Sequence, residues 1–205
     1  MKNNPGRLSL RKRLGLEIAL KMRNNLRELH PLRQLFWECT LRCNLACKHC
    51  GSDCRKMSEQ KDMPAEDFLW VIDSITPQVN PNEVNIIITG GEPLMRNDLE
   101  KVGLALYRRG YPWGIVSNGL YLTRERLDSL MAAGLHAVTI SLDGFAEEHN
   151  WLRGNPDSYE KALEAIKMLV HEPELTWDVV TCVNRKNYSH LGELKSYLYT
   201  IGVRN

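Results

Sequence analysis

From residue 34 onwards, short apolar runs alternate along the chain with longer segments that carry an apolar stripe. Runs rich in β-branched and aromatic residues are typical of strands, whereas apolar positions three or four residues apart are typical of helices. The pattern predicts strands at 35–39, 84–89, 113–117, 136–141 and 176–183. It predicts helices at 65–76, 98–109, 124–133, 158–170 and 190–200.

Capping residues support these helix limits. Pro64 suits a first helical turn, and Pro77 follows the end of the same helix. Asn97, with Glu100 three residues further on, is the expected N-cap of the next helix. Thr123 is the expected cap of the helix after that.

The alternation of strand and helix is typical of a parallel α/β sheet, and the strands read as buried on both faces. The pattern alone leaves a doubly wound sheet and a barrel open. The sequence ends where a sixth strand is expected, so we expect the chain to be truncated. The predicted organisation is a basic amphipathic helix and linker over 1–33, followed by an incomplete core domain over 34–205.

The N-terminal arm differs in charge from the rest of the chain. Apolar residues interleaved with Arg and Lys predict a helix over 7–29, and Pro31 stops the pattern. Nine basic and two acidic residues precede residue 34, a net charge of +7, which leaves −5 for the remainder of a chain whose total is +2. Such a helix packs its apolar stripe on the body of the protein or on a missing domain, docks on a partner, or makes a peripheral contact with a membrane surface.

Composition bounds the class of protein. A hydrophobic content of 43% over 205 residues is enough for one core. No apolar run approaches the roughly 20 residues that cross a bilayer, so no transmembrane segment is expected. Charged residues interrupt every apolar stretch near the start, so no signal peptide is expected and the predicted compartment is the cytoplasm. The acidic body carries no basic footprint, so we expect no nucleic acid partner.

Five of the six cysteines fall within sixteen residues. In a reducing compartment this concentration indicates metal or redox chemistry instead of disulfides. Cys43, Cys47 and Cys50 have the spacing C-x-x-x-C-x-x-C. Thiolates suit iron–sulfur clusters and zinc, and three of them leave one position open on a four-iron cluster. We expect Cys39 to be a small buried residue of the first strand and Cys54 to be a bystander.

A polar or glycine-rich motif follows every predicted strand. The cysteine loop follows the first, and the others are followed by Thr89-Gly90-Gly91-Glu92-Pro93, Ser117-Asn118-Gly119, Ser141-Leu142-Asp143-Gly144 and Val183-Asn184. Each motif alone is ordinary turn chemistry. Ligands bind at the carboxyl ends of parallel strands, so the motifs together indicate one shared binding site.

The pairing of Cys43-x-x-x-Cys47-x-x-Cys50 with Gly90-Gly91-Glu92-Pro93 resembles the radical S-adenosylmethionine (SAM) superfamily, over about residues 35–183. The Ser141–Gly144 and Arg153-Gly154 motifs are most similar to the subgroup that carries a C-terminal SPASM or twitch domain. The resemblance implies a partial, TIM-like (β/α)6 barrel with about five β-α units present. It also implies that the sixth unit and any SPASM domain lie outside this chain.

The resemblance further implies a ligand set. Cys43, Cys47 and Cys50 would bind three irons of a 4Fe–4S cluster, and the amino and carboxylate groups of S-adenosylmethionine would bind the fourth. The implied S-adenosylmethionine contacts are His49, Gly90, Gly91, Glu92, Ser117, Asn118, Ser141, Asp143 and Arg153.

Within the implied contacts, the roles differ by position. The Gly90–Glu92 segment would meet the methionyl amino group, and Arg153 would pair with the methionyl carboxylate. His49 would pack on the adenine. Ser117 and Asn118 would meet the methionyl or ribose end, and Ser141 and Asp143 would lie near the ribose.

The implied activity is that of a radical SAM enzyme. One electron from a low-potential cluster cleaves S-adenosylmethionine to a 5′-deoxyadenosyl radical, which abstracts a hydrogen atom from the substrate. An electron donor such as flavodoxin or ferredoxin is the implied partner. The sequence does not identify the substrate. A peptide or protein is the expectation from the subgroup, and a small molecule stays open.

Two other interpretations stay open from the residues. A zinc module would combine the three cysteines with Cys39, Cys54 or His49. Structural zinc sites usually combine two separated ligand pairs, however, and zinc would leave the Gly90–Pro93 motif unexplained. The other is a catalytically inactive fragment or partner of a full-length radical SAM enzyme. Cys182, at the end of the last predicted strand, is expected to be a core or pocket thiol.

Overall fold

The computed structural model describes residues 8–52 and 54–204, which divide into one unit up to Arg33 and another from Gln34. The first unit contains the helix α1 (Leu10–Leu29). Its N-cap Ser9 accepts a hydrogen bond from the Lys12 amide at 3.4 Å, and His30 ends it in the left-handed conformation. The helix begins at Leu10 instead of at residue 7, which lies outside the described residues.

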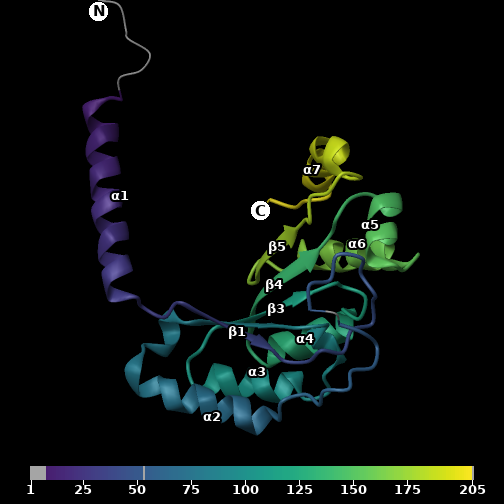
Figure 1. The fold of residues 1–205 in the computed structure, drawn as a ribbon, viewed down its shortest axis with the longest axis horizontal. Helices are drawn as coiled ribbons and strands as arrows, with labels where there is room; N and C mark the ends of the chain where they lie inside the picture. The colour runs from purple at the N-terminus through teal and green to yellow at the C-terminus, as the bar shows by residue number, and fades with distance from the viewer. Residues whose placement is uncertain (1–7, 53, 205) are drawn as a thin grey trace, which may run out of the picture. The chain divides into compact units, whose positions relative to one another are not determined.

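The second unit is built on one parallel sheet whose five strands neighbour each other in sequence order (Figure 1). The strands are β1 (Gln34–Glu38), β2 (Asn85–Thr89), β3 (Trp113–Ser117), β4 (Leu135–Ser141) and β5 (Thr176–Val180). Crossovers between parallel strands are right-handed in nearly all proteins, so this order places the connecting helices on one face. A doubly wound sheet would reverse its strand order instead. The predicted fold class, a partial parallel barrel with about five β-α units, is confirmed.

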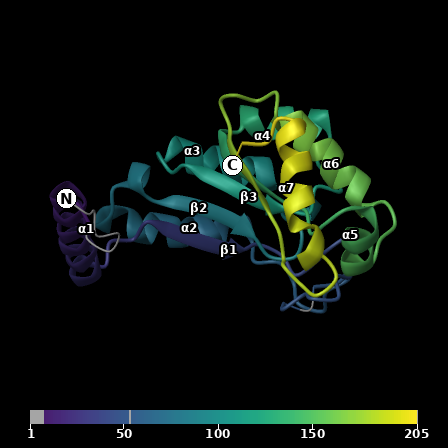
Figure 2. The ribbon, with the colours of Figure 1, turned by 90° about the horizontal axis from the view of Figure 1, so that it is seen from above.

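The helices cover that one face of the sheet. They are α2 (Ala65–Ile75), α3 (Leu99–Arg108), α4 (Arg124–Ala132), α6 (Ser158–Leu169) and α7 (Leu191–Thr200). The short helix α5 (Ala146–Arg153) lies between β4 and α6 in the chain and is hydrogen-bonded to the loop after β1. Short 3-10 turns occur at η1 (Thr76–Gln78), η2 (Pro81–Glu83), η3 (Pro93–Met95) and η4 (Tyr188–His190). Figure 2 shows α3, α4 and α6 following one another around the sheet. The Trp37 ring of β1 stacks on Phe68 of α2 with 4.0 Å between ring centroids, which fixes α2 to the core.

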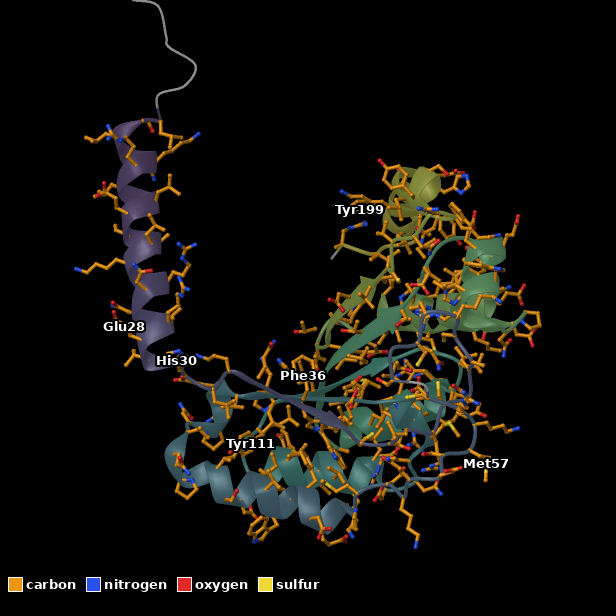
Figure 3. All side chains as sticks on the ribbon, in the orientation of Figure 1. Glu28, His30, Phe36, Met57, Tyr111 and Tyr199 are labelled. Carbon is orange, nitrogen blue, oxygen red and sulfur yellow. The ribbon has the colours of Figure 1, made fainter. Side chains whose placement is uncertain are left out.

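The opposite, inner face of the sheet is open. Phe36 is 61% exposed and lies on the side of β1 away from α2 (Figure 3). Ile87, Val116, Thr139 and Asp178 line the same hollow, whose volume is about 410 Å³. The prediction that the strands are buried on both faces is therefore wrong, because β1 and β5 are edges of an open sheet and only the helical face is covered.

One predicted helix cap is confirmed and one is wrong. Thr123 accepts a hydrogen bond from the Arg126 amide at 3.2 Å, as expected for a cap. The residue before α3 is Asp98 instead of Asn97, and its side chain caps no amide. Its carboxylate instead binds the Arg96 guanidinium at 2.8 and 2.7 Å.

Three further differences are local. Pro64 is the N-cap of α2 and precedes its first turn. The last strand ends at Val180 instead of residue 183, where the Asn187 side chain donates to the Cys182 carbonyl at 2.8 Å and turns the chain. The short helix α5, rich in charged and polar residues, was not predicted. Among the described residues, no helix has the length and apolar character needed to span a membrane.

Candidate functional site

The loop that carries the cysteines follows β1, and the backbone after β2 holds it in place. The Gly91 amide donates to the Thr40 carbonyl at 2.7 Å, and the Glu92 amide donates to the Arg42 carbonyl at 2.9 Å. A Cβ on Gly91 would lie 2.1 Å from the Arg42 carbonyl oxygen, and one on Gly90 would lie 2.4 Å from the Thr40 oxygen. Glycine is required here because two backbones pack in direct contact.

Arg96 anchors the start of the same loop from the interior. It is 3% exposed and donates from Nη1 to the carbonyls of Cys39 at 2.7 Å and Met63 at 3.1 Å. Its guanidinium also lies 4.9 Å from the Trp37 ring centroid, and Asp98 compensates its charge. Sequence reasoning missed Arg96, because most of its partners are far from it along the chain.

Two of the three predicted ligand cysteines lie beside a side-chain N–H donor. Asn118 Nδ2 is 3.9 Å from Cys43 Sγ, and Arg153 Nη1 is 3.8 Å from Cys47 Sγ. Hydrogen bonds to sulfur stabilise a thiolate and tune the potential of a metal bound to it. The strand ends therefore supply groups suited to charged sulfur at this position.

The third ligand cysteine, Cys50, accepts a hydrogen bond from the backbone of Cys54, which is not a predicted ligand. The Cys54 amide donates to Cys50 Sγ at 3.4 Å, with Cys50 exposed and Cys54 buried. Burial raises the pKa of both Cys43 and Cys54 to about 11 and that of Cys39 to about 12. Without a metal the Cys43 thiol stays protonated at neutral pH, so metal binding at Cys43 must release a proton. As predicted, Cys39 is buried, immediately after β1.

Glu92 is a buried carboxylate that joins the ends of β2 and β3. Its Oε1 accepts from Ser117 Oγ at 2.9 Å and from the Leu94 amide at 3.1 Å, and its Oε2 accepts from the Asn118 amide at 2.8 Å. Burial raises its pKa, and these hydrogen bonds oppose the shift. Among the described residues it forms no direct ion pair, and Arg153 acts on it only at longer range. A cation bound beside Glu92 would therefore offset a real desolvation cost.

The end of β4 and helix α5 form a second buried polar group. Asp143 Oδ2 accepts from Arg153 Nε at 2.6 Å, and Oδ1 accepts from the Cys182 amide at 2.8 Å. The Asp143 amide donates to His149 Nδ1 at 3.0 Å, and His149 Nε2 lies 3.0 Å from Ser158 Oγ. Burial first, and Arg153 second, lower the pKa of His149 to about 4, so the ring is neutral and donates from Nε2.

The remaining predicted residues lie at the same edge of the sheet. Ser141 is buried at the end of β4. His49 is exposed in the cysteine loop, and partial desolvation followed by Arg153 lowers its pKa. Cys182 is exposed, so of the two predicted settings, core or pocket, the core is wrong. Sequence reasoning missed His149, because it lies on the helix that was not predicted.

Within the described ranges, no three His, Cys, Asp or Glu side chains converge to hold a single metal ion. A site for a single metal ion such as zinc requires its ligands to converge on one point. Thiolates that bind different irons of one cluster need not converge on a single point.

A parallel partial barrel with a cysteine loop and a buried polar site at the carboxyl edge of its strands defines a barrel-type enzyme. The Radical SAM superfamily profile matches residues 37–198, and the chain belongs to this superfamily of enzymes. The predicted family is thereby confirmed.

Two relatives illustrate the similarity. The chain is 29% identical over 186 residues to the AdoMet-dependent heme synthase of Oleidesulfovibrio alaskensis, covering 90% of this chain and 47% of that protein. It is 31% identical over 182 residues to the tungsten-containing aldehyde ferredoxin oxidoreductase cofactor-modifying protein of Pyrococcus furiosus, covering 84% of this chain and 49% of that protein. The chain thus spans about half the length of the curated relatives it matches.

Solved structures share the fold at lower identity. Streptococcus suis SuiB bound to precursor peptide SuiA gives a TM-score of 0.70 at 17% identity, covering 99% of this chain and 46% of that one. Native anSMEcpe with bound AdoMet, which is S-adenosylmethionine, also gives a TM-score of 0.70, at 19% identity, and the match covers 83% of this chain and 49% of that one. SPASM/twitch-type proteins are therefore among the structural neighbours.

Proposed function

We propose that residues 34–205 are the core of a radical SAM enzyme in which Cys43, Cys47 and Cys50 bind a 4Fe–4S cluster. The single observation that carries the proposal is the placement of these three thiols in one loop at the carboxyl edge of the sheet, a loop whose first residues are hydrogen-bonded to Gly91 and Glu92. Residues 1–33 are then a separate helix and linker. The requirement for reduced thiols favours the cytoplasm.

The donor set fits a cluster. Three thiols from one short loop supply soft ligands, and an N–H group lies within 3.9 Å of each sulfur. Cys54 supplies its backbone amide to Cys50, so its buried thiol acts as support for the loop.

The surrounding charges fit the methionyl end of S-adenosylmethionine. The buried Glu92 carboxylate provides an anion for the ammonium group, and Ser117 and Asn118 hold that carboxylate in place. Arg153 provides a cation for the carboxylate group. Asp143 Oδ2 accepts from Arg153 Nε at 2.6 Å, so we propose that Asp143 acts by orienting Arg153. Ser141 and the exposed His49 would contact the nucleoside.

When bound, the cluster and S-adenosylmethionine would supply one-electron cleavage of the sulfonium to a 5′-deoxyadenosyl radical. The chain's own residues orient the reactants. Glu92 and Arg153 fix the two ends of the amino acid portion.

We propose that the substrate binds on the inner face of the sheet, in the hollow bounded by Phe36, Val116 and Asp178. A peptide or protein substrate is supported by the SuiB neighbour, whose solved complex contains a precursor peptide. The named relatives also include a heme synthase and a cofactor-modifying protein, so a small molecule is the other outcome of a substrate screen.

Anaerobic reconstitution with iron and sulfide tests the function. We expect a brown protein whose visible absorbance bleaches with dithionite and which forms 5′-deoxyadenosine from S-adenosylmethionine. Cys47→Ala should abolish both properties, whereas Cys182→Ala should keep them. A colourless protein that holds one zinc ion, or a brown protein that forms no 5′-deoxyadenosine, would contradict the proposal.

A further inference from the structure

Two lysines from separate segments lie over one exposed aromatic ring. Lys186 Nζ is 4.6 Å and Lys48 Nζ is 5.4 Å from the ring centroid of Trp151, which is 41% exposed on α5. In the part of the chain that the structure describes, neither ammonium group is ion-paired with a carboxylate. A ring can stabilise one cation, but a second nearby cation adds repulsion. The three residues Trp151, Lys48 and Lys186, which we name the Trp151 patch, therefore form a concentrated positive charge with no internal counterion.

The Trp151 patch adjoins the proposed cluster. Lys48 lies between Cys47 and Cys50 in the cysteine loop, and its amide donates to the Leu152 carbonyl at 2.8 Å. This bond fixes the loop to α5, so the patch and the cysteines move as one element. Cys50 is exposed in the same loop, so a cluster bound there would be accessible from the surface at this loop.

Charge singles out this part of the surface. The chain from residue 34 onwards has a net charge of −5, so an anionic partner is repelled by most of it. The segment 181–190 instead carries Arg185 and Lys186 with no acidic residue. On α5, Glu147 and Glu148 lie one turn before Trp151, and Glu148 Oε1 is 2.9 Å from His190 Nδ1. A local positive patch on an acidic body steers an anionic partner to one orientation.

We propose that the Trp151 patch is the docking surface for an acidic one-electron donor protein of the flavodoxin type. This inference rests on the proposed function. In the step it serves, the donor's flavin hydroquinone loses one electron to become the semiquinone, and the oxidised cluster gains that electron. A redox protein fits better than an anionic substrate for two reasons. The Trp151 patch adjoins the exposed Cys50, and none of the three residues of the patch lines the inner-face hollow.

Reduction kinetics of the reconstituted protein test the proposal. The double variant Lys48→Glu/Lys186→Glu is mixed anaerobically with hydroquinone flavodoxin, and bleaching of the cluster absorbance is followed by stopped flow. At low ionic strength we expect the second-order rate constant to fall by about tenfold or more, with the difference shrinking as salt is added. Lys186 lies outside the cysteine loop. The single variant Lys186→Glu should therefore show part of the same fall in rate constant, with unchanged iron content.

The control variant is Arg108→Glu/Lys167→Glu, which makes the same change in net charge near the C-terminal ends of α3 and α6. It should reduce at the wild-type rate. Dithionite-driven 5′-deoxyadenosine formation should be equal in all variants, since a small reductant needs no docking surface. An unchanged flavodoxin rate in the double variant would overturn the docking proposal, and so would an equal loss with dithionite. A wild-type protein that forms no 5′-deoxyadenosine with dithionite would instead overturn the proposed function.

Discussion

Arg153 and Asp143 form a buried ion pair, with Arg153 Nε 2.6 Å from Asp143 Oδ2, while Nη1 of the same guanidinium lies 3.8 Å from Cys47 Sγ. One side chain thus connects the end of β4 to the cysteine loop. Because the carboxylate fixes the plane of the guanidinium, Nη1 points toward Cys47.

Asp143→Asn should destabilise the protein strongly. It leaves the Arg153 charge buried without its partner, which costs about 3–5 kcal/mol in unfolding free energy. Urea denaturation of the cluster-free protein measures this cost. Asp73→Asn is the control, because Asp73 also pairs with an arginine, Arg109, but at a half-exposed site. That change should stay within about 1 kcal/mol, and equal effects of the two substitutions would contradict the role assigned to the buried pair.

Gly91→Ala should prevent correct cluster incorporation. The added methyl group would lie 2.1 Å from the Arg42 carbonyl oxygen, so the cysteine loop must shift. We expect the iron content after reconstitution to fall by more than half. Gly51→Ala tests the same loop without a clash, because nothing lies within 4 Å of its Cβ position. Iron content near wild type in Gly91→Ala would show that the backbone contact is dispensable.

Glu92→Gln should weaken S-adenosylmethionine binding without removing the cluster. The substitution keeps the side chain's size but removes its charge, which costs about 2 kcal/mol or more at a buried charged contact, roughly 30-fold in Kd. Isothermal titration of the reconstituted protein measures the change.

The pH dependence of that affinity gives a second test of Glu92. Burial raises the pKa of the carboxyl above its ordinary 4.5, so the anion is lost at a higher pH than for an exposed glutamate. Affinity should therefore fall as the pH is lowered, and the fall should begin earlier than an ordinary carboxyl would give. The Glu92→Gln protein should lack this component. Identical pH profiles for the two proteins would rule out contact with the ammonium group.

Cys39 should make the cluster-free protein less stable in alkali. Burial raises the pKa of its thiol from 9.0 to about 12, so the unfolded state loses the proton first as the pH rises. The stabilisation is complete below pH 9.0 and is lost as the pH rises toward about 12, by at most about 1.4 kcal/mol per pH unit. Cys39→Ala should reduce that slope when unfolding free energy is compared at pH 8.5 and 10.5. Equal slopes would show that the thiol titrates freely.

The strands and most helices could be predicted from sequence because their signals are local. β-Branched runs identify the strands, and Thr123 identifies the start of α4 by a bond three residues away. The eight-residue helix α5 was missed because most of its residues are charged or polar, which gives little apolar periodicity. The inner face was misjudged because Ile87 and Phe36 lie in apolar runs that read as buried, whereas their burial depends on what packs on that face of the sheet.

The candidate site also contains features that local sequence displays and features that it does not. The cysteine spacing and the Gly90–Glu92 motif lie within short segments, so the sequence displays them directly. The pairing of Asp143 with Arg153 depends on α5 folding back over the end of β4, and Arg96 reaches carbonyls far from it along the chain. These contacts follow from tertiary structure and have no local pattern.

Electron paramagnetic resonance of the dithionite-reduced, reconstituted protein tests the central claim most directly. A 4Fe–4S cluster held by Cys43, Cys47 and Cys50 predicts a reduced-cluster signal that changes on addition of S-adenosylmethionine, because the open iron position then gains ligands. The signal should be lost in Ala variants of these three cysteines and kept in Cys39→Ala and Cys182→Ala. A signal that survives Cys47→Ala, or one that S-adenosylmethionine leaves unchanged, would contradict the account.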